Sequence, residues 1–413
     1  MSSTLAGPVA GSERILTLDI VRGFALLGIF IMNMPGFSTS FFAEADGSRL
    51  WNDPLNKYAE IVRDMLFSGK FNSMFSLLFG IGFTIQLGRM LERDGAHASG
   101  LYLRRLLALL AFALVHACII WPGDVLHIYA VLGFGLLLLR KVPNRVIVAM
   151  IVATLLWPPI SGTLRILFQS PDIVAAMVAD AKLWEASNNL AFGKGSFLDA
   201  AREHAREFVH FYDGLWRAWG MFGFWVQMTT TMLIGFYIGR NGYVRRIPEL
   251  LPLIKRLQWW MLGIGIVCSL VFGIVGEYTR FPGPHPLKIL VGLAYIFSRL
   301  GLMLFYVLTI VRLAQQPAWQ HRFSGMAAAG RMPLTNYLMQ SLIGTFIFYG
   351  WGLGYWGKVG PAAEFLLAVF IFFALQVPLS IWWLKRFDFG PMEYLWRVLT
   401  YGRAAAARPA AAA

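Results

Sequence analysis

Charged residues and cysteines are scarce in this chain. Asp, Glu, Lys and Arg make up 14% of its 413 residues, whereas a soluble protein of ordinary composition would carry roughly 25%. The two cysteines, Cys118 and Cys268, lie in separate apolar stretches, so no disulfide framework is implied. The sequence also contains no Walker loop, no nucleophile elbow and no HExxH metal motif. The composition argues against a soluble globular enzyme, and no common motif assigns a reaction.

Apolar residues are abundant instead. They make up 57% of the chain, the mean hydropathy is +0.59, and 15 Trp, 14 Tyr and 33 Phe suit interfacial belts and helix packing. They form successive runs of about 20 residues, each long enough to cross a bilayer as a helix. The pattern predicts an all-α, polytopic transmembrane bundle of about ten spans, near residues 15–34, 67–88, 103–121, 125–140, 146–168, 219–239, 257–276, 287–311, 333–350 and 363–384.

One longer polar segment, residues 169–218, separates two sets of five spans. Ser170 is typical of a helix start, and Ser196 with Asp199 forms the pattern of a capping box before an amphipathic helix. We therefore expect four parts: an N-terminal five-span bundle (1–168), extramembrane amphipathic helices (169–218), a C-terminal five-span domain (219–403) and a disordered alanine-rich tail (404–413).

The distribution of basic residues predicts the orientation. Most of the 36 Lys and Arg residues fall in segments on the same side of the predicted spans as the N-terminus. The positive-inside bias therefore places both termini in the cytoplasm and residues 169–218 outside. Basic inner loops facing anionic lipid account for the net charge of +14, so no nucleic-acid partner is expected.

The first predicted span carries a charged pair and an amide. Asp19 and Arg22 are three residues apart, so they lie on neighbouring turns and can neutralise each other. Asn33 follows Arg22 by about three turns and shares its face, ~16 Å further along the axis. Ionisable groups in hydrocarbon mark functional positions unless they serve only as structural pairs. Arg299, in the eighth span, also needs a partner, and the sequence offers Asp19 or Glu277.

A second polar set is formed by His116, Asp124 and His127. The tight turn at residues 121–124 forces the third and fourth spans into an antiparallel pair. These three side chains should therefore converge near the outer surface, where Asn33 also lies. A histidine oriented by a carboxylate is the usual equipment for removing a proton from a hydroxyl or amine. Alternatively, Asp124 only caps the fourth helix and the histidines lie at the wet interface. No metal site is expected.

A third polar set lies in the ninth span. Asn336 and Gln340 are four residues apart and share one helical face, while Thr335 and Ser341 add hydroxyls. Arg331 precedes them at the cytoplasmic mouth. Hydrogen bonding between helices is the structural interpretation of these residues, and a substrate-binding face is the functional one.

Four separated segments resemble the YeiB-like family of bacterial membrane proteins: Leu18–Gly28, Trp121–Ala130, Gly330–Gln340 and Phe387–Arg397. The last two resemble the C-terminal domain of unknown function (418) that defines this family. The resemblance runs over nearly the whole chain and implies a multi-pass protein of the bacterial inner membrane.

A more distant resemblance concerns the first span, which is similar to that of the transmembrane acyltransferase superfamily. Arg22 matches an arginine of the O-acyltransferase branch, but Asn33 stands where that branch has its catalytic histidine. The heparan glucosaminide N-acetyltransferase branch has Asn at that position and a catalytic histidine in the next segment, and residues 35–66 of this chain contain no histidine. If the activity is shared, His116 or His127 must supply the base.

The leading hypothesis is therefore acyl transfer across the bilayer. Acyl-CoA would be a substrate and not a bound cofactor, and its phosphates would be attracted by Arg22, Arg104, Arg105 and Arg331. The acyl arm would extend toward Asn33. His116, oriented by Asp124, would activate a hydroxyl or amine of an envelope glycan or lipid.

Two alternatives remain open from the sequence. A secondary transporter or exporter of a small molecule would use Asp19, Arg22, Arg299 and the Asn336/Gln340 face as its path. A non-catalytic envelope factor would use all these residues as structural contacts. Whether the protein is an enzyme, and whether it is oligomeric, are not decided by the sequence.

Overall fold

The computed structural model describes residues 15–402, and within that range it is helical without a β-strand. The all-α prediction is therefore confirmed. The predicted tail, 404–413, lies outside the described residues. The helices are α1 (Leu16–Ser38), α2 (Pro54–Phe67), α3 (Lys70–Asp94), α4 (Ala98–Val115), α5 (Leu126–Leu139), α6 (Asn144–Leu155), α7 (Trp157–Phe168), α8 (Pro171–Ala191), α9 (Phe197–His210), α10 (Leu215–Arg240), α11 (Ile247–Tyr278), α12 (Pro286–Leu313), α13 (Pro317–Arg322), α14 (Ser324–Arg331), α15 (Pro333–Phe348), α16 (Pro361–Ile371), α17 (Val377–Leu384) and α18 (Pro391–Tyr401).

A helix coincides with each of the ten predicted spans. Among the described residues, seven helical segments are long and apolar enough to cross a membrane. An eighth is counted if α6 and α7, which meet at a 41° bend, act as one span. The two remaining predicted spans correspond to α5 and α15, which have only 14 and 16 residues. A multi-pass helical bundle is thus established, while the count of ten crossings and the cytoplasmic termini stay predictions.

The outer surface of the bundle is apolar. On α11 the buried residues are Ile254, Gln258, Gly265 and Ser269, and many of its large apolar side chains, such as Trp259 and Val267, are exposed. Soluble monomers rarely leave so extended an apolar surface in water. This surface suits contact with lipid tails, in agreement with a bilayer environment.

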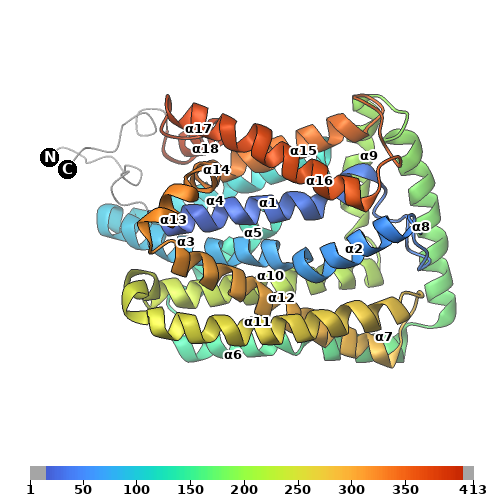
Figure 1. Cartoon of the computed structure of the whole chain (residues 1–413), viewed down its shortest axis with the longest axis horizontal. Coiled ribbons are helices and arrows are strands. Elements are labelled where there is room, and N and C mark those ends of the chain that lie inside the picture. The colour runs from blue at the N-terminus through green and yellow to red at the C-terminus, as the bar shows by residue number, and fades with distance from the viewer. Residues whose placement is uncertain (1–14, 403–413) are drawn as a thin grey trace.

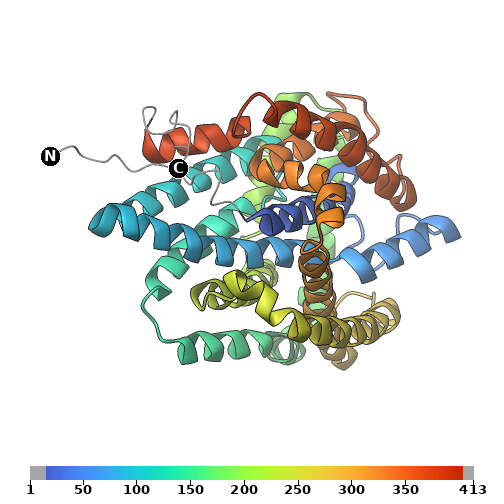
Figure 2. The same cartoon turned by 60° about the vertical axis from the view of Figure 1, so that its left-hand side comes forward.

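Most helices run side by side, and α8 lies across one end of the bundle (Figure 1). We call that end the cap end, and the opposite end, where α1 begins, the pocket end. In both views α1 lies between the C-terminal helices α14–α18 and the group α10–α12 (Figures 1 and 2). It packs against α3, α14, α15 and α16, and α3 packs against α10. Contacts therefore cross the predicted domain boundaries, which themselves stay predictions.

Close approach of α1 and α14 depends on two glycines. A Cβ atom on Gly23 would lie 2.1 Å from the carbonyl oxygen of Met326, and one on Gly330 would lie 1.9 Å from that of Asp19. Small residues at helix contacts are the usual means of close packing in membranes. This contact brings Asp19 and Arg331 to the same wall of the pocket end.

The cap is formed by α8 and α9. Ser196 and Asp199 form the predicted capping box at the start of α9, and α9 packs against the helical turn that follows α4. Its inner face buries Glu203, His204 and Glu207. Burial, together with the neighbouring charge of Glu203, raises the pKa of Glu207 to about 8. The segment that the sequence predicts to be extramembrane is thus part of the packed core at this end.

Candidate functional site

The candidate site is built around α15, which is flanked by two π-helical turns. One turn, His116–Ile120, ends α4, and the other, Phe372–Gln376, joins α16 to α17. π-Helical turns are rare and occur frequently at functional sites. Each of these two turns contributes a polar side chain that hydrogen-bonds a residue of α15, namely His116 and Gln376.

His116, Asp124 and His127 meet as the sequence predicts. The Nδ1 atom of His116 lies 2.8 Å from Asp124 Oδ1, and Nδ1 of His127 lies 2.9 Å from Oδ2. The backbone N–H of His127 also donates to Asp124 Oδ2, at 2.9 Å, so Asp124 satisfies a donor in the first turn of α5 as well as joining the two imidazoles. All three residues are buried.

The network fixes the direction of its hydrogen bonds. Asp124 lies in the turn between α4 and α5; burial alone would raise its pKa, but the hydrogen bonds from His116 and His127 bring that pKa below its ordinary value. An ionised carboxylate only accepts hydrogen bonds, so both imidazoles present Nδ1–H to it. The Nε2 atom of His116 is then an acceptor, and it lies 2.9 Å from the hydroxyl of Ser341. His116 is therefore arranged to take a proton from a hydroxyl.

The same logic extends the network to the cap. His127 Nε2 lies 2.6 Å from the hydroxyl of Tyr212, which follows α9, and the indole N–H of Trp225 donates to that hydroxyl at 3.3 Å. The Tyr212 residue is 36% exposed. A continuous chain of hydrogen bonds therefore runs from buried Ser341 to the surface of the cap end.

Towards the pocket end, α15 carries further polar contacts. Asn336 donates to the Ser380 hydroxyl at 3.0 Å, and Gln340 donates to Gln376 Oε1 at 2.9 Å. The hydroxyl of Thr335 donates to the carboxylate of Glu393, with 2.5 Å between Thr335 Oγ1 and Glu393 Oε2. Because Thr335 and Ser341 are six residues apart, they are separated by ~9 Å along the helix axis. Buried polar groups thus link the histidine network to the pocket end.

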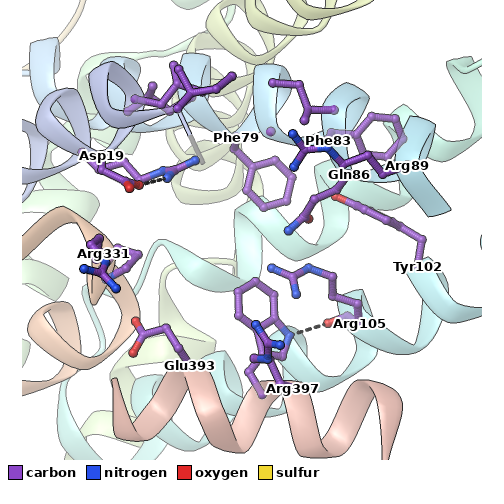
Figure 3. Close-up of a pocket in the computed structure, with 18 of the residues that line it drawn as sticks. Asp19, Phe79, Phe83, Gln86, Arg89, Tyr102, Arg105, Arg331, Glu393 and Arg397 are labelled. Carbon is purple, nitrogen blue, oxygen red and sulfur yellow. Dashed lines mark hydrogen bonds and ion pairs between the residues drawn. The ribbon is translucent and has the colours of Figure 1, made fainter. Parts of the chain in front are cut away.

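A basic cavity of about 310 Å³ opens at the pocket end. Arg89, Arg105, Arg331 and Arg397 surround it from α3, α4, α14 and α18 (Figure 3). Its charged lining consists of six arginines and two carboxylates: Arg22, Arg89, Arg93, Arg105, Arg331, Arg397, Asp19 and Glu393. The excess of positive charge suits an anionic ligand with several phosphate or carboxylate groups.

The predicted Asp19–Arg22 pair is present at the wall of this cavity. Arg22 Nη1 lies 2.6 Å from Asp19 Oδ1, and the side chains are 27% and 3% exposed respectively. Asp19 is therefore buried, while the guanidinium of Arg22 borders the cavity. This pair follows from the three-residue spacing alone because the interaction is local to one helix.

Three expectations are corrected or left without support. Arg299 pairs with neither Asp19 nor Glu277: its Nη1 donates to the hydroxyl of Ser73 at 2.5 Å, and Glu277 is occupied by Arg49 and Lys57. Arg104 is exposed and does not line the cavity, whereas Arg105 does. Asn33 is half-buried, and its side chain has no hydrogen bond within residues 15–402.

Several residues of the site carry no local signal in the sequence. Ser341, Tyr212 and Glu393 each meet their partners through tertiary contacts. Arg89 and Arg93 are four residues apart on α3, so their shared face was a usable local signal. In the part of the chain that the structure describes, no group of three His, Cys, Asp or Glu residues has the geometry to hold a metal ion.

Comparisons with known proteins agree with the resemblance to YeiB-like proteins. Residues 238–403 match the family described as "Protein of unknown function (DUF418)". The chain is 33% identical over 411 residues to the uncharacterized protein YxaH of Bacillus subtilis (strain 168), covering 95% of this chain and 96% of that protein. It is 28% identical to the uncharacterized protein YeiB of Escherichia coli (strain K12), over 94% of this chain and 96% of YeiB. The chain thus belongs to the YeiB-like family of DUF418 proteins.

Proposed function

We propose that this protein is a membrane-embedded acyltransferase that carries an acyl group from a cytoplasmic acyl-CoA to an acceptor at the opposite end of the bundle. The observation that supports it is the buried His116, whose Nδ1 is held by Asp124 and whose Nε2 accepts from a hydroxyl. A base oriented in this way removes a proton from an attacking hydroxyl or amine.

The donor would occupy the basic cavity. Its six arginines against two carboxylates suit the phosphates of CoA, which act as multidentate acceptors for guanidinium groups. The volume of about 310 Å³ falls within the usual range for small-molecule sites, roughly 300–1,000 Å³. Acyl-CoA would enter and leave as a substrate.

The acceptor would approach at the cap end, as a hydroxyl or amine of an envelope glycan or lipid. This assignment follows the positive-inside orientation, with both termini in the cytoplasm of a bacterial inner-membrane protein. Reporter fusions at Gly195 and after Tyr401 should give opposite signals. Equal signals would contradict the orientation on which the acceptor side depends.

Binding of acetyl-CoA to the purified protein tests the donor site. Arg105→Ala should weaken binding by about tenfold or more, because a charge-assisted contact is worth roughly 1.5–3 kcal/mol. Arg104→Ala is the matched control, since Arg104 is the exposed neighbour that does not line the cavity. Equal affinities of the two variants for acetyl-CoA would contradict the assignment of the cavity as the donor site.

Release of CoA in the presence of candidate acceptors tests the base. His116→Ala should abolish turnover while acetyl-CoA binding is preserved, because the base acts on the hydroxyl and not on the nucleotide. Full transferase activity in a His116→Ala, His127→Ala double variant would contradict the assignment of a histidine as the base.

A transporter is the second candidate, because the buried amides Asn336 and Gln340 also suit a substrate path through the bundle. It would show no CoA binding, and transport of a small anion would respond most to changes at Asp19 or Asn336. The same acetyl-CoA titration therefore separates the two functions.

A further inference from the structure

Ser341 occupies the position of a nucleophile relative to His116. Its hydroxyl lies 2.9 Å from His116 Nε2, and His116 Nδ1 lies 2.8 Å from Asp124. All three side chains are buried, with Ser341 0% exposed. A hydroxyl, an imidazole and a carboxylate in this order form the constellation that activates serine in unrelated enzymes, whatever the fold.

We propose that Ser341 carries the acyl group as a covalent ester between donor and acceptor. This inference rests on the proposed acyl transfer and adds to it a two-step route with an acyl-enzyme intermediate. The acyl group would enter from the pocket end and leave towards the cap end, with Ser341 between them.

The polarity of the network favours this role over that of a passive hydrogen bond. Because Asp124 accepts from Nδ1–H of His116, Nε2 carries no hydrogen, and Ser341 must be the donor in the Ser341–His116 contact. The serine proton therefore already points at the atom that would remove it. A serine that only joined two helices could equally well accept a hydrogen bond from His116, because its hydroxyl can donate or accept.

Tyr337 supplies a candidate donor for the oxyanion. It lies one turn before Ser341 on α15, on the same face, and its ring centroid is 5.2 Å from that of His116. Its hydroxyl oxygen accepts the backbone N–H of Val125 at 3.4 Å, which leaves its own hydrogen to donate. A donor aimed at the developing negative charge is a large term in acyl transfer.

The two steps balance. In the first, Ser341 Oγ attacks the thioester carbonyl carbon and His116 Nε2 takes the hydroxyl proton. The carbon–sulfur bond breaks, and the leaving thiolate takes that proton from the imidazolium. In the second, the acceptor hydroxyl or amine loses its proton to His116 and attacks the ester, and Ser341 Oγ leaves and regains the proton. Burial protects the ester from water between the steps.

A covalent intermediate has a direct test that requires no acceptor. The purified protein is incubated with radiolabelled acetyl-CoA alone, quenched in acid, digested and analysed by mass spectrometry. The label should appear on the peptide containing Ser341, with one CoA released per site. Ser341→Ala should lose the label, and Ser341→Cys should restore it as a thioester. Ser269→Ala, at a buried hydroxyl on α11 that hydrogen-bonds Ser298, is the matched control and should label normally.

A fluorophosphonate probe measures the reactivity of the Ser341 hydroxyl independently of the acyl donor. It should label Ser341 in the wild type and fail in His116→Ala, while melting curves confirm that the variants are folded. Normal CoA release with an acceptor by Ser341→Ala would overturn the covalent route and leave acyl transfer standing. Fluorophosphonate labelling of Ser341 without acetyl-CoA binding would support the activated serine and overturn acyl-CoA as its donor. Absence of both labels on folded wild-type protein would overturn the inference.

Discussion

Replacing Asp124 by Asn should separate the stability of the network from its chemistry. The carboxylate accepts three hydrogen bonds, from His116 Nδ1, His127 Nδ1 and the backbone N–H of His127. In Asp124→Asn, the amide oxygen can keep both contacts with His127 while its NH₂ group faces His116. That arrangement retains all three contacts only if His116 changes tautomer, with Nδ1 as acceptor and Nε2–H as donor.

The two substitutions at this position should therefore differ in their effect on stability but not in their effect on turnover. Asp124→Asn should cost about 1–2 kcal/mol of stability, because the contacts persist without the charge. Asp124→Ala leaves three donors unsatisfied and should cost about 3–9 kcal/mol, at roughly 1–3 kcal/mol each. Both should lose turnover by about three to four orders of magnitude, because neither variant holds His116 in the tautomer and orientation whose Nε2 accepts the serine proton.

The assay combines three measurements on detergent-solubilised protein: melting temperature, CoA release and nitrogen NMR of labelled histidine, which reports the tautomer. Asp213→Asn is the matched control, since it makes the same chemical change at an exposed side chain. An Asn variant with wild-type turnover, or an Ala variant as stable as the wild type, would refute the reasoning about this network.

Three further predictions concern the rest of the bundle. Arg22→Ala should destabilise the protein more than the Asp19→Ala, Arg22→Ala double variant, because the single change removes the cation that lies 2.6 Å from a buried carboxylate and leaves that carboxylate in place; melting temperatures of the three proteins decide it. Gly330→Ala should cost about 1–3 kcal/mol by forcing α14 away from α1, whereas Gly263→Ala, which faces open space, should be tolerated. The raised pKa of Glu207, about 8, means that the folded state holds a proton that the unfolded chain releases above about pH 4.5. Stability should therefore fall as pH rises from 4.5 to 8, and Glu207→Gln should melt higher than the wild type at pH 8 but equally at pH 4.5.

Local sequence spacing predicted the contacts made within one helix or across one tight turn. Asp19 with Arg22 and Asp124 with His127 are both three residues apart, and the Trp121–Asp124 turn brings His116 to the same carboxylate. Helical geometry is sufficient for such pairs.

Contacts between distant segments were beyond the reach of spacing arguments. Ser341 meets His116 across 225 positions of the chain, and Arg299 meets Ser73 across 226. Such pairings depend on how each helix is rotated about its axis and how far it is shifted along its neighbours, and hydropathy encodes neither. The π-helical turns add to the difficulty, because they change the face that a side chain presents without changing composition.

The π-helical turn at His116–Ile120 has a consequence for the divergence of this family. A π-helical turn holds one residue more than a turn of α-helix, so deleting one residue there would restore regular winding. Each residue of an α-helix turns by ~100°, so the deletion would rotate His116 away from Ser341 while the hydropathy of the segment stayed nearly the same. A relative with a one-residue gap at this turn, or at Phe372–Gln376, should therefore keep the fold and lose the proposed chemistry. In alignments, gap placement at these two points should separate members with the proposed activity from members without it more reliably than overall identity.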